Sequence, residues 1–273
     1  MSRIAGCFQQ LSEQGRKALI PYIVAGDPEP EVTVNMMHAM VDRGADIIEL
    51  GVPFSDPMSE GSVIQLAHER ALANGIRLRD VLAMVKTFRE QDQKTPVLLM
   101  GYANPVEHMG YEAFADAAAG AGLDALLTVD IPPEEVDPVN EQLRRVDMDN
   151  IFLIAPTTAD DRIDRIVGRA SGFVYYVSVK GVTGSASLDI DDVSKNLERI
   201  RSKTSLPLAV GFGIKDAQSA AAVAAVADGV VVGSALIRLM NDTIEAGGDK
   251  QAAMAAALAL LSEIRDGIDG VAS

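Results

Sequence analysis

The chain of 273 residues is 48% apolar and carries a formal net charge of −15 at pH 7. Its length allows one large α/β barrel, a single domain over residues 1–273. Its acidic charge disfavours binding to nucleic acid or to an anionic membrane surface. A phosphate ligand would feel the same repulsion, so its site would have to be built locally from backbone N–H groups and helix N-termini.

The sequence has one cysteine, Cys7, which lacks zinc-ligand spacing with the three histidines, His38, His68 and His108. We therefore expect no intrachain disulfide and no metal site. The N-terminal residues form no long apolar leader. The longest apolar run, 252–261, is too short to span a bilayer and is predicted to be a buried helix. A reduced, metal-free protein of the cytoplasm is expected.

The predicted elements begin with a helix at about 2–14 and continue as short β-branched or leucine-rich runs that alternate with helical stretches. The predicted strands are 19–24, 46–50, 97–100, 125–129, 151–154, 173–177, 208–210 and 230–232. The helical stretches include 31–43, 63–73, 111–119, 159–169 and 216–225. Eight such units without a flexible linker favour a (β/α)8 TIM barrel plugged at its bottom by the N-terminal helix. An open doubly wound sheet is the alternative, because closure is invisible in sequence.

Glu49 lies at the carboxyl end of the second predicted strand, where barrels of this kind place reactive groups. Strand alternation puts it on the same side as Ile47, and one of the two sides points into the barrel. Burial would raise the pKa of this carboxyl, which suits a group that gives and takes a proton near neutrality. A structural carboxylate paired with Lys or Arg is equally compatible with the position.

The loop that follows, 51–61, is longer than a usual strand-to-helix connection and supplies a second carboxylate, Glu60. Two carboxylates can divide acid and base roles. Taken alone, Glu60 is more typical of a solvated loop charge or a first-turn helix residue.

A second long loop, 178–188, is rich in small residues and is predicted to be a mobile lid. The glycine turns at 211–214 and 233–234 follow the seventh and eighth predicted strands. Glycine lets backbone N–H groups approach a phosphate there, and a helix N-terminus adds a positive dipole. The alternative is that these turns need glycine only for their conformation.

A series of short motifs occurs in a characteristic order. They are Pro-Tyr at 21–22, Gly-Asp-Pro at 26–28, Glu-Leu-Gly-Val-Pro-Phe-Ser-Asp-Pro at 49–57, Ile-Gln at 64–65, Tyr-Ala-Asn-Pro at 102–105, Gly-Val-Thr-Gly at 181–184 and Gly-Phe-Gly-Ile at 211–214. Together they resemble the tryptophan synthase alpha chain family. The match runs from about residue 15 to residue 237. The Pro-Phe-Ser-Asp-Pro run is its most specific part.

The resemblance implies a lyase that cleaves indole-3-glycerol phosphate into indole and glyceraldehyde 3-phosphate by a retro-aldol route. Glu60 would take the indole N–H proton, while Glu49 would protonate the ring carbon and then help convert the side-chain hydroxyl to the aldehyde. The other positions that the resemblance implies are Tyr22, Met100, Leu127, Leu153 and Phe212 around the indole, Tyr175 on the glycerol part, Thr183 closing onto the loop carboxylate, and Gly184, Gly213, Gly233 and Ser234 around the phosphate. Of these, Leu127 and Leu153 fit plain barrel core better.

The resemblance also implies a partner, a beta chain that holds pyridoxal phosphate and receives indole through a tunnel in an alpha2-beta2 heterotetramer. This chain itself would need no cofactor. The interface residues that the resemblance implies are Pro53, Phe54, Asp56, Asn104, Pro105 and Pro132. One departure concerns the loop carboxylate, because the family usually has Asp where this chain has Glu60.

Two other functions stay open. One keeps the fold and the interface but treats Glu60 as the mark of a weakened enzyme that mainly activates the beta chain. The other is a different phosphate-binding barrel enzyme, such as a sugar-phosphate epimerase or phosphoribosyl isomerase. Such enzymes would need metal ligands or paired aspartates on other strands, and the sequence offers neither.

Overall fold

The structure is a computed structural model that describes residues 2–178, 189–211 and 213–271. Eight parallel strands close into a barrel in chain order. The strands are β1 Ala18–Val24, β2 Ile48–Gly51, β3 Val97–Gly101, β4 Ala125–Thr128, β5 Asp149–Ile154, β6 Val174–Val177, β7 Leu208–Gly211 and β8 Gly229–Val232. The helices of the described residues are α1 Arg3–Glu13, α2 Pro30–Asp42, α3 Ser62–Ala73, α4 Leu78–Arg89, α5 Ala103–Met109, α6 Tyr111–Ala121, α7 Asp137–Arg145, α8 Asp160–Val167, α9 Ile190–Arg201, α10 Ala217–Ala224, α11 Ser234–Glu245 and α12 Lys250–Asp269.

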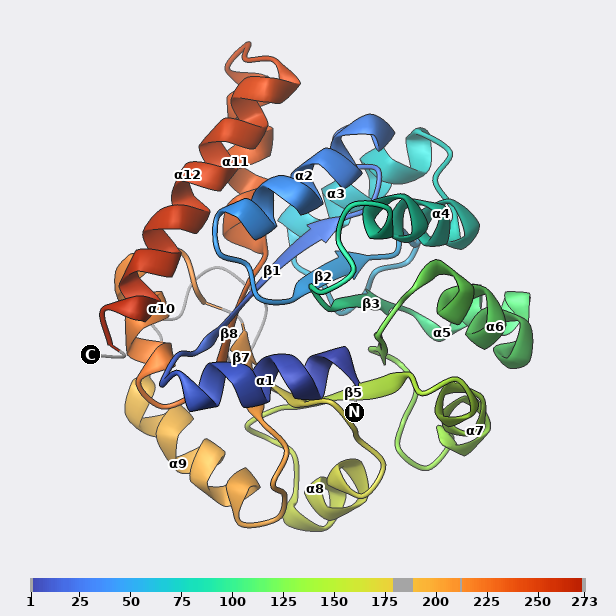
Figure 1. Ribbon diagram of the computed structural model, residues 1–273, viewed down its shortest axis with the longest axis vertical. Coiled ribbons are helices and arrows are strands. Elements are labelled where there is room, and N and C mark those ends of the chain that lie inside the picture. Colours follow the sequence, from blue (N-terminus) through green and yellow to red (C-terminus); the bar gives the residue numbers. More distant parts are fainter. Residues whose placement is uncertain (1, 179–188, 212, 272–273) are drawn as a thin grey trace.

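Barrel closure rests on the pairing of the first strand with the last. Ala18 of β1 lies beside Gly229 of β8, and Leu19 lies beside Val230 in the same parallel register. The predicted (β/α)8 TIM barrel is therefore confirmed, and the alternative of an open doubly wound sheet is wrong. All eight predicted strands are present, with bounds that shift by one or two residues. The helices surround the barrel as an outer ring (Figure 1).

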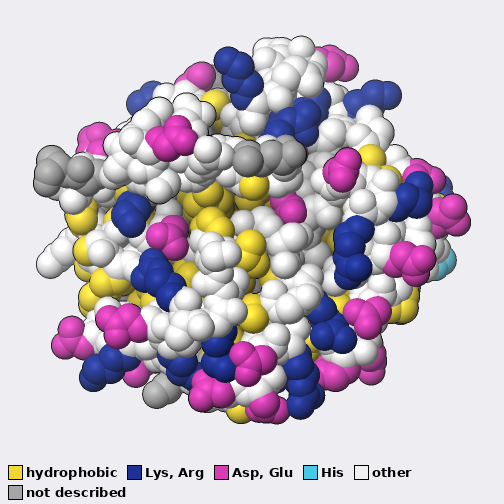
Figure 2. All heavy atoms as spheres, turned by 60° about the horizontal axis from the view of Figure 1, so that its bottom comes forward, with side chains coloured by type: hydrophobic (Ala, Val, Ile, Leu, Met, Phe, Trp, Pro, Cys, Tyr) yellow, Lys and Arg dark blue, Asp and Glu magenta, His cyan; other side chains and the backbone are white. Residues whose placement is uncertain are grey.

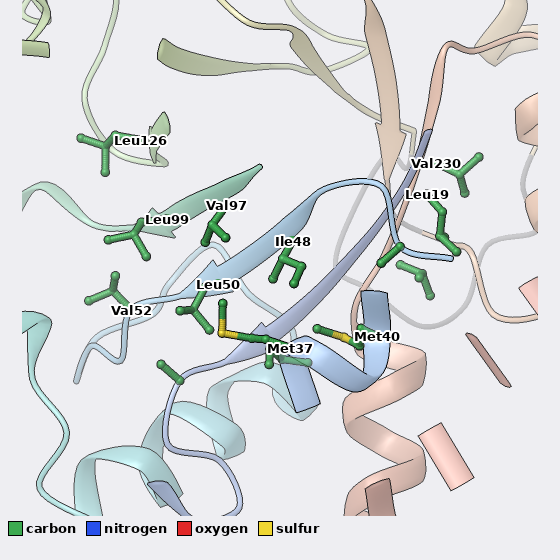
Figure 3. Packing of buried hydrophobic residues seen from close by; sticks show 14 of the residues in the cluster. Leu19, Met37, Met40, Ile48, Leu50, Val52, Val97, Leu99, Leu126 and Val230 are labelled. Atoms are coloured by element: carbon green, nitrogen blue, oxygen red, sulfur yellow. The ribbon is translucent and has the colours of Figure 1, made fainter. Parts of the chain in front are cut away.

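Strand alternation divides the apolar residues into two layers. Ile48 and Leu50 of β2 point outward and pack in the same cluster as Met37 and Met40 of α2 (Figure 3). Ile47, just before β2, belongs to the cluster inside the barrel. Because successive side chains of a strand point to opposite faces, residue 49 points inward, on the same side as Ile47, as alternation predicted.

The N-terminal helix α1 lies across one end of the barrel (Figure 1). Its apolar side chains Ile4, Phe8 and Leu11 are buried with the residues of the barrel interior. The ring of Phe8 lies 5.6 Å from that of Phe173, which directly precedes β6. Ser2 caps this helix by accepting a hydrogen bond from the backbone N–H of Ala5. The predicted plug is thus present, and it lies at the end of the barrel opposite the carboxyl termini of the strands.

The C-terminal helices α11 and α12 lie side by side (Figure 1). The predicted helix at 252–261 forms the central part of α12, whose buried face includes Ala253, Ala257 and Leu261. Within the described ranges, no helix combines the length and the apolar character that a membrane crossing requires.

A buried ion pair holds the plugged end of the barrel together. Arg89 of α4 is almost fully buried and lies 2.6 Å from Asp124, the residue before β4, which also pairs with Arg3 of α1 at 2.8 Å. We expect Arg89→Ala to lower the free energy of unfolding by about 3 kcal/mol, because it leaves a buried carboxylate with fewer partners. Urea unfolding measures this loss.

The matched control is Arg145→Ala, which breaks a pair of similar length, 2.6 Å to Asp116, between exposed side chains. Its expected cost is at most about 1 kcal/mol, because solvent screens exposed pairs. Equal losses for Arg89→Ala and Arg145→Ala would contradict the importance of the buried pair.

Both signs of charge are mixed on the outer surface. Figure 2 shows one face on which acidic and basic side chains are interspersed around a hollow that contains apolar side chains. Ion pairs between neighbouring helices contribute to this pattern, such as Arg199 of α9 with Asp160 of α8 at 2.6 Å. The net negative charge is therefore not gathered into one patch on this face.

Candidate active site

Glu49 lies inside the barrel near the carboxyl end of β2 and is 1% exposed. Its neighbours in the strand register are Tyr22 of β1 and Leu98 of β3. Within the described part of the chain, neither carboxylate oxygen of Glu49 has a hydrogen-bond partner, and no lysine or arginine forms an ion pair with it. Among the described residues, the structure therefore gives no support to the alternative of a structural carboxylate paired with a cation.

Burial, followed by the negative charge of Glu60, raises the pKa of Glu49 from 4.5 to about 8. Removal from water disfavours the charged form of a carboxyl, and a second carboxylate nearby disfavours it further. At pH 7 the Glu49 side chain is therefore a carboxylic acid that can donate a proton, and its conjugate base is a strong enough base to take one back.

The raised pKa of Glu49 has a consequence for stability. Between pH 4.5 and pH 8 the folded chain holds a proton on Glu49 that the unfolded chain has lost. The free energy of unfolding of the wild type therefore falls as pH rises through this window, by at most about 1.4 kcal/mol per pH unit from this group. Glu49→Gln removes the effect. Urea unfolding at pH 5.5 and pH 8.5 measures this effect. Between these two pH values, the free energy of unfolding of Glu49→Gln should rise relative to that of the wild type by a few kcal/mol. The same difference at both pH values would contradict the raised pKa of Glu49.

Glu60 lies on the loop between β2 and α3 and is 6% exposed, so the alternative of a solvated loop charge is wrong. The Tyr102 hydroxyl donates a hydrogen bond to its carboxylate. The backbone carbonyl of Glu60 also accepts a hydrogen bond of 2.8 Å from the Gln65 amide. Burial raises the pKa of Glu60, while the Tyr102 hydrogen bond opposes that rise. The Tyr102 hydrogen bond therefore holds the Glu60 carboxylate in place and favours its charged form.

Tyr102 is a site residue that the sequence analysis included only as part of a motif. It directly follows β3 and is buried. Its hydroxyl accepts a hydrogen bond of 3.0 Å from the backbone N–H of Ser59, and its ring stacks on Phe54 at 4.9 Å. One tyrosine therefore fixes the loop at two points and orients the carboxylate of Glu60. Its place at the end of a predicted strand was the one signal for this role.

The residues predicted to contact the indole, and Tyr175, predicted to contact the glycerol part, lie on the inner face of the barrel where the structure describes them. Tyr22, Met100 and Tyr175 belong to the interior cluster, and so does the fully buried Leu127, with Leu153 packed against it. Glycines make room for the two tyrosines. A Cβ atom on Gly51 would overlap the hydroxyl of Tyr22, and one on Gly211 would overlap that of Tyr175. Phe212, Thr183 and Gly184 lie outside the residues that the structure describes.

The predicted phosphate residues that are described lie at the carboxyl ends of β7 and β8. Gly233 is the N-cap of α11, and Ser234 is the first residue of that helix. Gly213 has a φ of +84°, a left-handed conformation that favours glycine. The first backbone N–H groups of a helix have no partner within the helix, and its dipole attracts anions. This arrangement can bind a phosphate group.

The predicted interface residues differ in their exposure. Asp56 and Asn104 are exposed, Phe54, Pro105 and Pro132 are half-buried, and Pro53 is buried within the chain itself. Met58, which the sequence analysis did not single out, is 81% exposed on the same loop as Phe54 and Asp56. No cluster of metal-ligating side chains was found in the described residues.

Fold and site together define a class: (β/α)8-barrel enzymes with buried carboxylates at the carboxyl ends of the strands. Comparison with known proteins narrows this class. The sequence model of the tryptophan synthase alpha chain matches residues 8–268. The chain belongs to the tryptophan synthase alpha chain family.

Relatives match over the full chain. The tryptophan synthase alpha chain of Marinobacter nauticus is 59% identical over 100% of both chains. That of Thioalkalivibrio sulfidiphilus is 61% identical over 98% of this chain and 100% of the relative. The crystal structure of tryptophan synthase subunit alpha from Legionella pneumophila superposes with a TM-score of 0.91 at 46% identity, covering 99% of each chain.

Proposed function

We propose that this chain is the lyase that cleaves indole-3-glycerol phosphate into indole and glyceraldehyde 3-phosphate. The observation that carries the proposal is the buried Glu49 carboxyl, which has no hydrogen-bond partner among the described residues and a pKa raised to about 8 near a second carboxylate. A retro-aldol cleavage needs an acid and a base that exchange roles during the reaction, and such a group exchanges them near neutral pH.

The proton steps balance between the two carboxyls. The Glu60 carboxylate takes the proton from the indole nitrogen while the Glu49 acid gives a proton to the ring carbon that bears the side chain. The ring has then become an electron acceptor. The Glu49 carboxylate next takes the proton of the adjacent side-chain hydroxyl, the carbon–carbon bond breaks, and its electron pair enters the ring as the aldehyde forms. Glu60 returns its proton to the nitrogen, so both residues end as they began.

The remaining residues bind and orient the substrate in this proposal. Gly213, Gly233 and Ser234 bind the phosphate, together with Gly184. Tyr175 contacts the glycerol part, and Thr183 closes onto Glu60. The indole ring packs against Tyr22, Met100 and Phe212. The support for the described members of this set is their position at the carboxyl ends of the strands or on the inner face of the barrel.

The proposed partner is a beta chain in an alpha2-beta2 heterotetramer in the cytoplasm. The beta chain holds pyridoxal phosphate, and this chain needs no cofactor of its own. The proposed contact surface is formed by Phe54, Asp56, Asn104, Pro105 and Pro132. These residues follow strands β2, β3 and β4, so they lie at the same end of the barrel as Glu49. They are exposed or half-buried and include proline, aromatic and polar side chains, which supports this proposal.

Indole release from indole-3-glycerol phosphate tests the proposal. The assay uses the purified chain with its beta chain present and compares the wild type with Glu49→Gln. The proposal expects turnover well above the Glu49→Gln background. A wild type that releases no more indole than this background, yet still raises the activity of the beta chain, would instead identify the chain as an activator.

A further inference from the structure

His68 lies on α3, next to the loop 51–61 that carries Glu60 (the catalytic loop), and is 1% exposed. Its Nδ1 atom lies 3.0 Å from the backbone nitrogen of Phe54. A backbone N–H group can only donate, so Nδ1 must accept and carries no proton. Burial lowers the pKa of His68 to about 4, so the ring is neutral near pH 7. Its one N–H proton is therefore on Nε2.

The Nε2 atom of His68 lies 3.4 Å from the hydroxyl oxygen of Tyr22, which makes a long hydrogen bond. Because Nε2 is the protonated nitrogen, it donates and the Tyr22 oxygen accepts. Tyr22 therefore does not donate its hydroxyl proton to His68, and this proton stays available for another acceptor. The direction of this bond therefore follows from the bond that Phe54 makes on the other side of the ring.

Tyr22 reaches from β1 across the carboxyl end of β2. Its backbone is the direct register neighbour of Glu49, and its hydroxyl occupies the space above Gly51, two residues further along. Burial, followed by the negative charges of Glu60 and Glu49, raises the pKa of Tyr22 well above its ordinary value. The phenol is therefore protonated at any pH at which the enzyme would work, and the charges of Glu60 and Glu49 act on it.

We infer that His68 is a positioning residue for Tyr22. As a neutral imidazole it joins the backbone of the catalytic loop to the Tyr22 oxygen, and it thereby leaves the phenol proton as a hydrogen-bond donor directed toward the pocket of Glu49 and Glu60. The acceptor of this proton is a carboxylate oxygen of Glu60 or Glu49, because each of the two residues is ionised at one stage of the proposed reaction. The catalytic consequence rests on the proposed lyase function, whereas the protonation state of His68 does not.

The first test measures that protonation state directly. In the whole chain labelled with ¹⁵N-histidine, the His68 signals are those that disappear in His68→Asn. At pH 7 the inference predicts an unprotonated Nδ1 and a protonated Nε2. A proton on Nδ1, or an imidazolium ring, would overturn it whether or not the chain proves to be a lyase.

The second test compares His68→Asn with His68→Leu. The two replacements have similar size, but only asparagine carries an acceptor and a donor. With indole release as the readout and the beta chain present, His68→Leu should lower kcat by about threefold to tenfold, the effect of one neutral hydrogen bond, with little change in KM. His68→Asn should restore part of the loss. Equal losses in the two variants would contradict a hydrogen-bonding role.

A double-mutant cycle with Tyr22→Phe completes the experiment. Once the phenol is absent, His68→Leu should cost clearly less than it costs in the wild type, because the two residues act through one bond. Tyr176→Phe is the matched control. It removes a buried hydroxyl that has no hydrogen-bond partner within the described part of the chain and belongs to the outer apolar layer, and it should leave the effect of His68→Leu unchanged. Additive losses for His68→Leu and Tyr22→Phe would overturn the inference.

Discussion

Glu49→Gln should lower kcat for the cleavage of indole-3-glycerol phosphate by about 10²- to 10⁴-fold, the usual contribution of a positioned acid–base group. Glutamine has nearly the same size and no charge, so it fits a site in which the carboxyl is already neutral at pH 7. It cannot release a proton to the ring carbon or accept one from the hydroxyl. Steady-state indole release with the beta chain present measures the effect.

Two further measurements, of KM and of stability, distinguish this loss of activity from misfolding. KM should change little, because Glu49 acts on the reacting atoms and the proposed phosphate site lies at the ends of β7 and β8. The stability of the variant at pH 7 should equal or exceed that of the wild type. A Glu49→Gln enzyme that keeps more than a tenth of the wild-type rate would contradict the role of Glu49.

Glu60→Gln and Glu60→Asp should have opposite outcomes. Glutamine cannot accept the indole N–H proton, so we expect Glu60→Gln to lose most activity, on the order of 10²-fold or more. Aspartate keeps the carboxylate and withdraws it by about 1 Å, a displacement large enough to matter for rate. Because the resemblance to the family implies aspartate at this position, we expect Glu60→Asp to keep or raise the rate. Indole release at saturating substrate measures both variants.

Tyr102→Phe provides the control for this comparison. It removes the hydroxyl that donates to Glu60 but leaves the carboxylate able to accept a proton. Its loss should therefore be smaller than that of Glu60→Gln. If Glu60→Gln kept the full rate, Glu60 would not be the base, whatever the result for Tyr102→Phe.

The sequence predicted the fold well because local patterns determine each unit. Short β-branched or leucine-rich runs located every strand, and strand alternation placed Glu49 on the same side as Ile47. Closure of the barrel was harder to predict, because it depends on the pairing of Ala18 in the first strand with Gly229 in the last strand. No local pattern reports that contact.

The site was predicted in part. The positions of Glu49 and Glu60 followed from strand alternation and loop length, but their environments did not. Whether Glu49 lacks a cation depends on side chains from several other strands, and the burial of Glu60 depends on Tyr102 from a distant loop. His68 gave no signal of its own, because its two partners, Phe54 and Tyr22, lie on different units. Such contacts arise only when the units are assembled.

The titration of the Glu49 carboxyl in the folded chain tests the central claim most directly. Carbon-13 NMR of the chain labelled at its glutamate carboxyls follows this group, and Glu49→Gln identifies its signal. The structure predicts a titration midpoint near pH 8, caused by burial and by the charge of Glu60. A midpoint near the ordinary glutamate value of about 4.3 would contradict the claim that Glu49 holds the catalytic proton at neutral pH.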